Sequence, residues 1–245
     1  MSCEACLTIP PVIKDNYRPK GSYSTISGLK TYITGPADAM KAIVAFYDIF
    51  AHIPQTLQGA DILATALNAQ VIIPDLLEGH YAKVDWYLPS ADEKHLKAKA
   101  EYFADVFQCH KYLPKLNEFI KSYPGGITTW GSYGLCWGAK IVAMTSGKDT
   151  VWKVSAQAHP SELDAAEVKQ IEIPHIILAS EREDSGVVAE CKRFLEVERK
   201  SGVVDTYPTQ LHGWMAARAD LADENVRKEY LRGYTQLAEF FHNNL

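Results

Sequence analysis

Apolar and polar residues alternate along this chain with two different periods, and each period predicts a different kind of element. Polar and aromatic residues alternate on either side of Ser27-Gly28, which predicts a β-hairpin. The near-continuous apolar run at residues 42–46 is typical of a strand that is buried on both faces. Further short apolar runs predict strands at residues 71–73, 126–130, 152–158, 173–180 and 203–208.

Helical periodicity separates these strands. From Ala91 onward, Leu96, Ala100, Phe103 and Phe107 share one face of a predicted helix, which Pro114 breaks or kinks. Other helices are expected at residues 56–69, from the turn after residue 130 to Met144, at 187–200, and from about residue 223 to the C-terminal end.

Strands that alternate with helices indicate an α/β fold with a mostly parallel sheet and helices on both faces. In such sheets, ligands bind at the carboxyl ends of the strands. The loops of interest are therefore those that follow Phe46, Ile73, Trp130, Ala158, Ala179 and Tyr207.

Length and composition restrict the class of protein. The 245 residues contain no repeat or linker-like stretch, so we expect a single domain over 1–245. Apolar residues make up 47% of the chain and the net charge is −5, with no lysine and arginine cluster that would indicate nucleic-acid binding. We find neither a signal-peptide pattern nor an apolar run of 18 residues, and therefore expect a cytoplasmic protein that is not associated with a membrane.

The five cysteines are an odd number, which argues against a disulfide framework; they are Cys3, Cys6, Cys109, Cys136 and Cys191. Cys3 and Cys6 form a Cys-x-x-Cys pair, but no second pair is present to complete a zinc site. We interpret them as two thiols of an N-terminal tail and expect no metal and no cofactor.

Gly134, Cys136 and Gly138 form a Gly-x-Cys-x-Gly pattern between a predicted strand and a predicted helix. This is the nucleophile-elbow pattern Gly-x-Ser-x-Gly with sulfur in place of oxygen. The amino end of the helix favours a thiolate, and the amide of Trp137 is aimed at a developing oxyanion. The alternative is a small buried thiol at a tight packing point.

A nucleophilic thiol needs a base and a group that orients the base. In this fold the chain order is nucleophile, acid, histidine. His212 lies in the loop before the last helix, and Glu181, Glu183 and Asp184 follow the strand at residues 173–180. We prefer Asp184 as the acid, while Glu181 and Glu183 remain within reach.

Two further residues fall at strand ends near the predicted elbow. Asp48 follows the buried strand, where a carboxylate is costly unless it is paired or faces a cleft. His159 precedes Pro160 at the end of another strand. Either side chain could contact a substrate, or cap and pack the local structure.

At these positions the chain resembles the dienelactone hydrolase family of the α/β-hydrolase fold over nearly its whole length. The resemblance rests on the segments FYDIFA, IIPDLLEG, GLCWGAK, AHPS, EDSGV and LHGWMAARADL, and the stretch PKGSY…GLKTYITGP resembles the fungal-type branch. It implies a Cys/His/Asp triad of Cys136, His212 and Asp184, and an oxyanion hole formed by the amides of Ile49 and Trp137.

The chain departs from the family pattern in two places. The carboxylate beside the first oxyanion residue is usually Glu in the family and is Asp48 here. The two arginines that hold the substrate carboxylate in bacterial members have no clear match, because one segment offers only His80 and Lys83 and Arg218 is spaced differently. We therefore expect a substrate other than the small dienelactone, in a more aromatic pocket formed by Trp86, Tyr87 and Trp214.

The sequence predicts a hydrolase that cleaves a small-molecule ester or lactone through Cys136 and acts as a monomer or homodimer. Two alternatives are a non-hydrolytic family member of secondary metabolism, which closes or rearranges a lactone, and a small-molecule-binding accessory protein. A redox thiol protein is not favoured, because no other cysteine lies within twenty residues of Cys136 and Cys109 and Cys191 fall in helical patterns.

Overall fold

Eight strands form one sheet in the computed structural model, which describes residues 4–12 and 17–245. The sheet order is β1-β2-β4-β3-β5-β6-β7-β8. The pairs β1–β2 and β2–β4 are antiparallel, and all other neighbours are parallel. The strands are β1 (Ser22–Ile26), β2 (Leu29–Thr34), β3 (Lys41–Phe46), β4 (Gln70–Pro74), β5 (Thr129–Leu135), β6 (Trp152–Ala158), β7 (His175–Ala179) and β8 (Gly202–Thr206).

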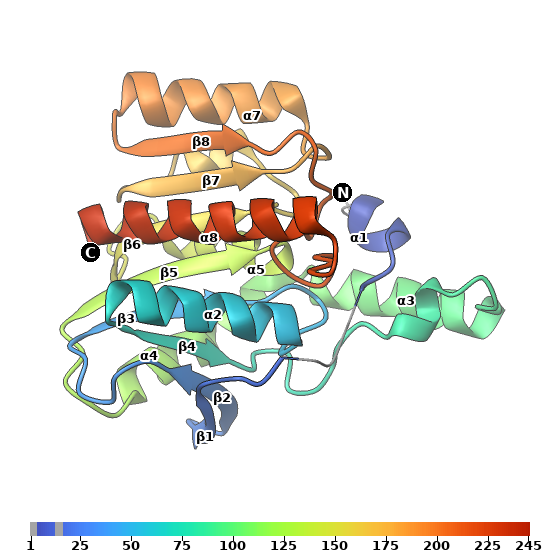
Figure 1. Ribbon diagram of the computed structural model, residues 1–245, viewed down its shortest axis with the longest axis horizontal. Helices are drawn as coiled ribbons and strands as arrows, with labels where there is room; N and C mark the ends of the chain where they lie inside the picture. Colours follow the sequence, from blue (N-terminus) through green and yellow to red (C-terminus); the bar gives the residue numbers. More distant parts are fainter. Residues whose placement is uncertain (1–3, 13–16) are drawn as a thin grey trace.

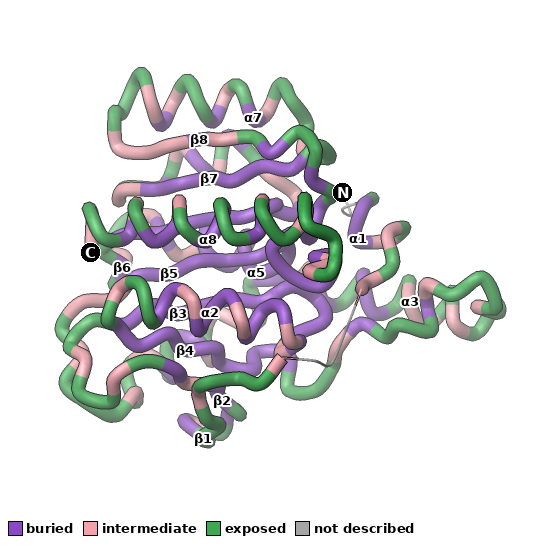
Figure 2. Tube along the Cα trace, in the orientation of Figure 1, coloured by how far each residue is buried: buried purple, intermediate pink, exposed green. Residues whose placement is uncertain are grey.

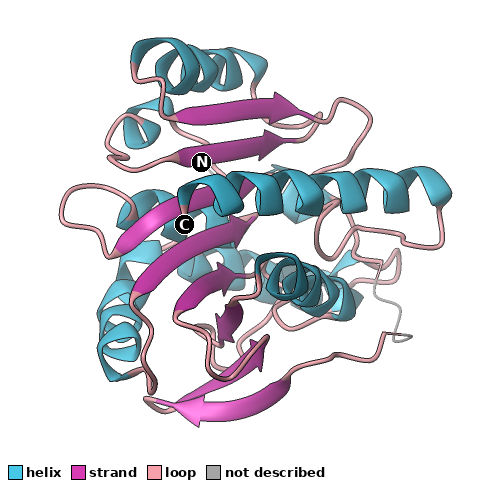
Figure 3. Cartoon of the chain, turned by 60° about the vertical axis from the view of Figure 1, so that its left-hand side comes forward, coloured by secondary structure: helices cyan, strands magenta, loops and turns pink. Residues whose placement is uncertain are grey.

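Helices cover both faces of this sheet, as the alternation of elements predicts (Figure 1). Helices α2 (Pro54–Leu67) and α8 (Glu224–Asn244) pack together on one face, and α5 (Trp137–Thr145) packs on β3, β5 and β6 from the other. Figure 3 shows α8 running along its face of the sheet. The remaining helices are α1 (Glu4–Thr8), α3 (Glu93–Val106), α4 (Leu113–Ser122), α6 (Ala165–Val168), α7 (Ser185–Lys192), the 3₁₀ helices η1 (Val84–Tyr87) and η2 (Cys109–Tyr112), and the π-helix η3 (Arg193–Glu198).

The apolar runs of the sequence become the buried centre of the sheet. All residues of β3 from Ala42 to Phe46 are buried, and the central strands are buried along most of their length (Figure 2). The predicted hairpin is β1–β2, in which Ser27 (φ 50°) and Gly28 (φ 78°) occupy the left-handed region. A two-residue turn with both residues in that region matches the twist of an antiparallel pair.

The helices differ from the sequence prediction at their ends. Pro114 stands in the first turn of α4, where proline starts a helix without loss of a hydrogen bond, so it begins a new helix after η2. Leu96 is exposed on α3, whereas Phe103 is buried as expected. The helix predicted for residues 187–200 is α7 followed by η3. No helix in the described ranges is long and apolar enough to cross a membrane.

The N-terminal segment is not a tail. Residues Glu4–Thr8 form α1, which lies at the carboxyl ends of the parallel strands and buries Ala5 and Cys6 (Figure 1). The amide of Val12 donates to the carbonyl of Ala217 at 2.7 Å, which fixes the segment beyond α1 to the loop before α8. Cys3, the other half of the predicted Cys-x-x-Cys pair, lies outside the described residues.

His175 at the start of β7 is a buried histidine held between two polar side chains. Its Nε2 donates to Gln157 Oε1 at 3.0 Å, and its Nδ1 accepts from the Ser155 hydroxyl at 2.8 Å. Because an amide oxygen only accepts, Nε2 carries a proton, and the Ser155 hydroxyl can donate to Nδ1 of a neutral ring. Burial lowers the pKa of His175 from 6.5 to about 3.

We expect His175 to make the protein sensitive to acid. Below pH 6.5 the His175 ring is protonated in the unfolded chain but stays neutral in the folded one. The free energy of unfolding is therefore highest above pH 6.5 and decreases as the pH falls toward 3. The decrease in the free energy of unfolding that is due to His175 reaches about 2 kcal/mol at pH 5. Urea unfolding of His175→Gln between pH 5 and 7.5 should show that much less pH dependence than the wild type. Equal pH dependence in the wild type and in His175→Gln would contradict the prediction.

Candidate active site

Cys136 stands at the sharp turn between β5 and α5. Its backbone has φ 54° and ψ −111°, a strained conformation for a residue with a side chain. Its amide donates to the carbonyl of Ala158 at 3.1 Å, and its carbonyl accepts from the amides of Ala139 and Ser161, each at 3.1 Å. These bonds hold the strained residue in place at the carboxyl edge of the sheet.

The two glycines of the pattern are required by close backbone contacts. A Cβ on Gly134 would lie 2.2 Å from the carbonyl oxygen of Gly138, and a Cβ on Gly138 would lie 2.2 Å from that of Phe46. The amide of Gly138 also donates to the carbonyl of Tyr47 at 3.1 Å. The turn is therefore pressed against itself and against the end of β3, which explains why glycine flanks the cysteine.

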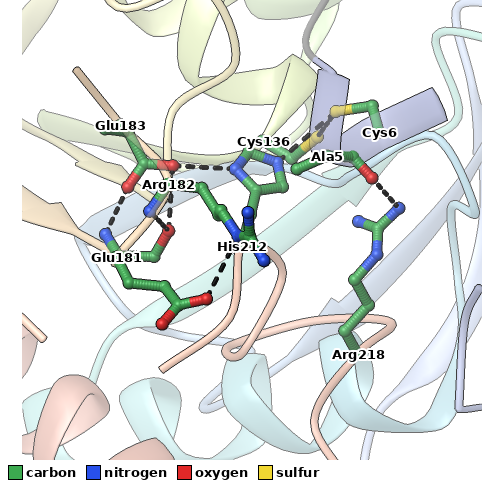
Figure 4. A network of polar contacts seen from close by, with 9 residues as sticks. Ala5, Cys6, Cys136, Glu181, Arg182, Glu183, His212 and Arg218 are labelled. Atoms are coloured by element: carbon green, nitrogen blue, oxygen red, sulfur yellow. Dashed lines mark hydrogen bonds and ion pairs between the residues drawn. The ribbon is translucent and has the colours of Figure 1, made fainter. Parts of the chain in front are cut away.

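His212, in the loop between β8 and α8, is oriented by a carboxylate. Its Nδ1–H donates to Glu183 Oε1 at 2.8 Å, and both side chains are buried, with exposed fractions of 1% and 3% (Figure 4). Glu183 also accepts from the amide and from the hydroxyl of Ser180. The tautomer fixed by this bond leaves Nε2 facing the sulfur atoms on the other side of the ring.

Glu183 takes the place that the sequence analysis gave to Asp184. The carboxylate of Asp184 accepts from the amide of Val187 at 2.9 Å and so caps the amino end of α7. Glu181 is exposed and pairs with Arg182 at 3.1 Å. A residue whose carboxylate is turned onto its own helix cannot reach the histidine, whereas its neighbour in the loop does.

Cys136 and His212 are brought together as predicted, and a second sulfur lies with them. Cys6 Sγ is 3.2 Å from Cys136 Sγ and 3.4 Å from His212 Nε2. All three ligand atoms lie within 4.8 Å of one another, and all three residues are buried. The expectation that no cysteine lies beside Cys136 is wrong, because α1 carries Cys6 across 130 residues of sequence. Two sulfurs and an imidazole nitrogen could also hold a thiophilic metal ion such as zinc.

Side chains from three other segments hold α1 over the site. The Tyr87 hydroxyl donates to the Cys6 carbonyl at 2.7 Å, and Lys99 Nζ donates to the carbonyl of Leu7. Arg218 donates to the carbonyl of Ile9 at 2.8 and 2.9 Å and to that of Ala5 at 3.2 Å. Tyr87, which the sequence analysis placed in the substrate pocket, and Arg218, its candidate arginine for the substrate, therefore contact the protein's own N-terminal segment.

A cleft of about 250 Å³ opens between α1 and the loops after β6 and β7. His212 and Glu183 reach it from the sheet edge, and Pro160 lies on the same side. Ala5 and Thr8 form the wall on the α1 side. The imidazole of His212 is thus the point at which the cleft meets the sulfur cluster, which consists of Cys6 and Cys136.

Asp48 is fully buried and binds backbone amides. Its Oδ1 accepts from Phe50 at 2.8 Å and its Oδ2 from Ala217 at 3.0 Å. Burial raises the pKa of Asp48, and the two amides and the Arg218 guanidinium oppose that rise. The carboxylate therefore ties the loop after β3 to the loop that carries His212, and faces the protein instead of a substrate.

His159 lies directly beside His212. The two ring centroids are 5.2 Å apart, and His159 adopts φ 37° while its amide donates to the carbonyl of Leu178 at 2.7 Å. Burial, and then the charges of His212 and Arg218, lower the pKa of His159 well below its ordinary value. A neutral ring at this position supports one side of the His212 imidazole.

The other predicted substrate-binding residues lie away from the sulfur cluster or in the core. His80 is exposed, with its ring 5.2 Å from that of Tyr102, which also lies 5.3 Å from the buried Trp86. Trp214 stacks on Tyr207 at 4.2 Å and packs against Gly233 of α8. Aromatic packing therefore accounts for these side chains, and the aromatic pocket expected from the sequence is not formed by Trp214.

A mostly parallel eight-stranded sheet, an elbow after a central strand and a histidine before the last helix define the α/β-hydrolase fold. The model of the Dienelactone hydrolase family matches residues 29–245, and the chain belongs to that family. Membership of this family supports a hydrolase activity for the chain.

The relatives agree with this assignment. Two uncharacterized AIM2 family proteins of Schizosaccharomyces pombe are each 32% identical to this chain over 233 residues, covering 92% of both sequences. These fungal proteins agree with the fungal-type pattern near the N-terminal end. The crystal structure of a dienelactone hydrolase from Anabaena variabilis superposes with a TM-score of 0.65 at 15% identity, over 94% of this chain and 100% of that one, and shows the same fold.

Proposed function

We propose that this protein hydrolyses a small ester or lactone, with Cys136 as nucleophile, His212 as general base and acid, and Glu183 as the carboxylate that orients His212. The observation that carries the proposal is the position of the imidazole, with the Glu183 carboxylate at 2.8 Å on one side and the sulfur of the strained Cys136 within 4.8 Å on the other. Membership of the dienelactone hydrolase family supports the same reaction class.

The reaction begins with attack of the Cys136 sulfur on the carbonyl carbon of the substrate. His212 Nε2 accepts the thiol proton and then gives it to the leaving oxygen, which yields a thioester. His212 next takes a proton from water, and the hydroxide released attacks the thioester and frees Cys136. The Glu183 carboxylate stabilises the imidazolium that forms twice in the cycle.

Two backbone amides are suited to hold the tetrahedral oxyanion. Trp137 is the first residue of α5, where an amide has no partner within its own helix. Ile49 follows Asp48, whose carboxylate fixes the turn after β3 by its bonds to Phe50 and Ala217. In comparable sites, each such donor is worth about 3 kcal/mol of transition-state stabilisation.

The cleft limits the size of the substrate. Its volume of about 250 Å³ accommodates a small acyl group or a single lactone ring. Since Cys6 and α1 cover the sulfur of Cys136, the substrate reaches that sulfur when α1 is displaced from the carbonyl contacts of Tyr87, Lys99 and Arg218. A larger substrate requires a larger displacement of α1, so we expect small activated esters to react faster than bulky ones.

Alkylation with iodoacetamide tests the proposal. We expect Cys136 to be modified near neutral pH faster than free cysteine, with loss of p-nitrophenyl acetate hydrolysis in parallel. Cys109 and Cys191 are internal controls, because burial raises the pKa of Cys109 to about 12 and that of Cys191 to about 11. Alkylation of Cys136 at the rate of free cysteine, in a protein without esterase activity, would instead support a small-molecule-binding accessory protein.

A further inference from the structure

Cys6 is fixed next to Cys136 by contacts that a loose tail would not make. Its carbonyl accepts from Tyr87, and the carbonyls on both sides of it accept from Arg218 and Lys99. Its side chain is fully buried. Three side chains that lie far from α1 in the sequence therefore bring one sulfur against another.

The distance between the two sulfurs favours a bond between them. A disulfide has a length of about 2.05 Å, and the 3.2 Å separation is therefore about 1.2 Å longer, a change that rotation of the side chains could bridge. Two thiolates on a tetrahedral zinc ion would lie about 3.8 Å apart, from zinc–sulfur bonds of about 2.3 Å. The two sulfurs are closer than a shared zinc ion requires.

We propose that Cys6 and Cys136 form a redox modification site, in which a hydroperoxide converts the two thiols into a disulfide that blocks the nucleophile and a dithiol restores them. The disulfide chemistry depends only on the sulfur cluster. The loss of activity that accompanies it rests on the proposed function.

The first step oxidises Cys136. Its thiolate attacks one oxygen of hydrogen peroxide, the S–O bond forms and the O–O bond breaks. The hydroxide that leaves combines with the proton lost by the thiol and becomes water. The sulfur loses two electrons to the peroxide, and Cys136 becomes a sulfenic acid. The cleft brings this small oxidant as far as His212, which lies next to the two sulfurs.

The second step joins the two cysteines. His212 Nε2, 3.4 Å from Cys6 Sγ, takes the thiol proton of Cys6. The Cys6 sulfur then attacks the sulfenic sulfur, the S–S bond forms, and the hydroxide that leaves takes the proton from His212 as a second water. The sum is two thiols and one peroxide giving one disulfide and two waters. A dithiol reverses the reaction by exchange and supplies two electrons and two protons.

The test uses the full chain, reduced with dithiothreitol, desalted into EDTA and treated with hydrogen peroxide. After N-ethylmaleimide blocks the remaining thiols, non-reducing peptide mapping should show a Cys6–Cys136 crosslink. Ester hydrolysis should fall, as the crosslink accumulates, to the level of Cys136→Ala and return with dithiothreitol. Cys191→Ala, which removes a buried thiol of α7 outside the cluster, should form the same crosslink.

Cys6→Ala should be inactivated relative to its own untreated activity and should not recover, because Cys136 then passes to the sulfinic acid. A crosslink of Cys136 to Cys3 would overturn the proposal, as would reversible inactivation of Cys6→Ala. So would oxidation without any crosslink, or a loss of activity that occurs only when EDTA is left out of the buffer. If neither the wild type nor any of the variants hydrolyses esters, the proposed function fails. The peptide map still decides whether the disulfide forms.

Discussion

Replacing Cys136 with alanine is expected to lower kcat for activated esters and lactones by about 10³-fold or more. The remaining groups cannot form the thioester, so the reaction would have to proceed by direct attack of water. Wild type and variant should be compared with p-nitrophenyl acetate and with a small lactone under single-turnover conditions, which separate chemistry from product release.

The matched control for this loss is Cys191→Ala. Cys191 is also buried and belongs to the smaller apolar cluster around α7, so its replacement removes a sulfur of the same kind from another part of the protein. We expect its kcat to stay near that of the wild type. Turnover in Cys136→Ala that matches turnover in Cys191→Ala would refute Cys136 as the nucleophile.

Replacing Glu183 with glutamine is expected to lower kcat by about 10²–10⁴-fold. Glutamine has nearly the same shape, but its amide group can donate to Nδ1 of His212 and so favour the tautomer that carries its proton on Nε2. In that tautomer the ring cannot accept the proton of Cys136. The effect should therefore fall on kcat, with little change in the unfolding midpoint.

Asp184→Asn is the matched control, because it makes the same chemical change one residue away. Asparagine caps a helix about as well as aspartate, so α7 and the overall stability should be preserved and kcat should remain close to that of the wild type. Asp184→Ala should cost about 1 kcal/mol of stability through loss of the cap, again without a large change in kcat. The reverse ranking, with Asp184→Asn the more damaging change, would return the acid role to Asp184.

The distinction between these two acids shows what the sequence could and could not predict. The pattern placed an acid after β7, and three carboxylates, those of Glu181, Glu183 and Asp184, could fill the position. A capping signal was nevertheless present, since Asp184 stands three residues before Val187, where the helical pattern begins, and capping turns a carboxylate onto amides two or three residues ahead. That local preference leaves Glu183 to face His212.

The elbow and the histidine were predictable because they follow from local rules. Apolar runs and their spacing place the strands, and parallel strands bring their carboxyl ends to one edge. Close backbone contacts at Gly134 and Gly138 then leave room for no side chain larger than hydrogen. The apolar runs and the Gly-x-Cys-x-Gly pattern lie within short segments and can be recognised in the sequence, although the contact of Gly138 with Phe46 joins distant parts of the chain.

The position of Cys6 was not predictable in this way. Its place depends on Tyr87, Lys99 and Arg218, which donate to backbone carbonyls of the N-terminal segment. Any residue has a carbonyl, so such contacts leave no mark on the sequence of the segment they hold. The same limit applies to Trp214, which stacks on Tyr207 in the core although its position after His212 suggested a substrate contact.

The most direct measurement of the central claim is the identity of the residue that carries the acyl group during turnover. The wild type should be mixed with p-nitrophenyl acetate, quenched with acid within the first turnover and digested for peptide mass mapping. We expect the acetyl group on Cys136, in a peptide that loses it to hydroxylamine as a thioester does. An acetyl group on any other residue, or hydrolysis that proceeds with Cys136 unmodified, would contradict the account.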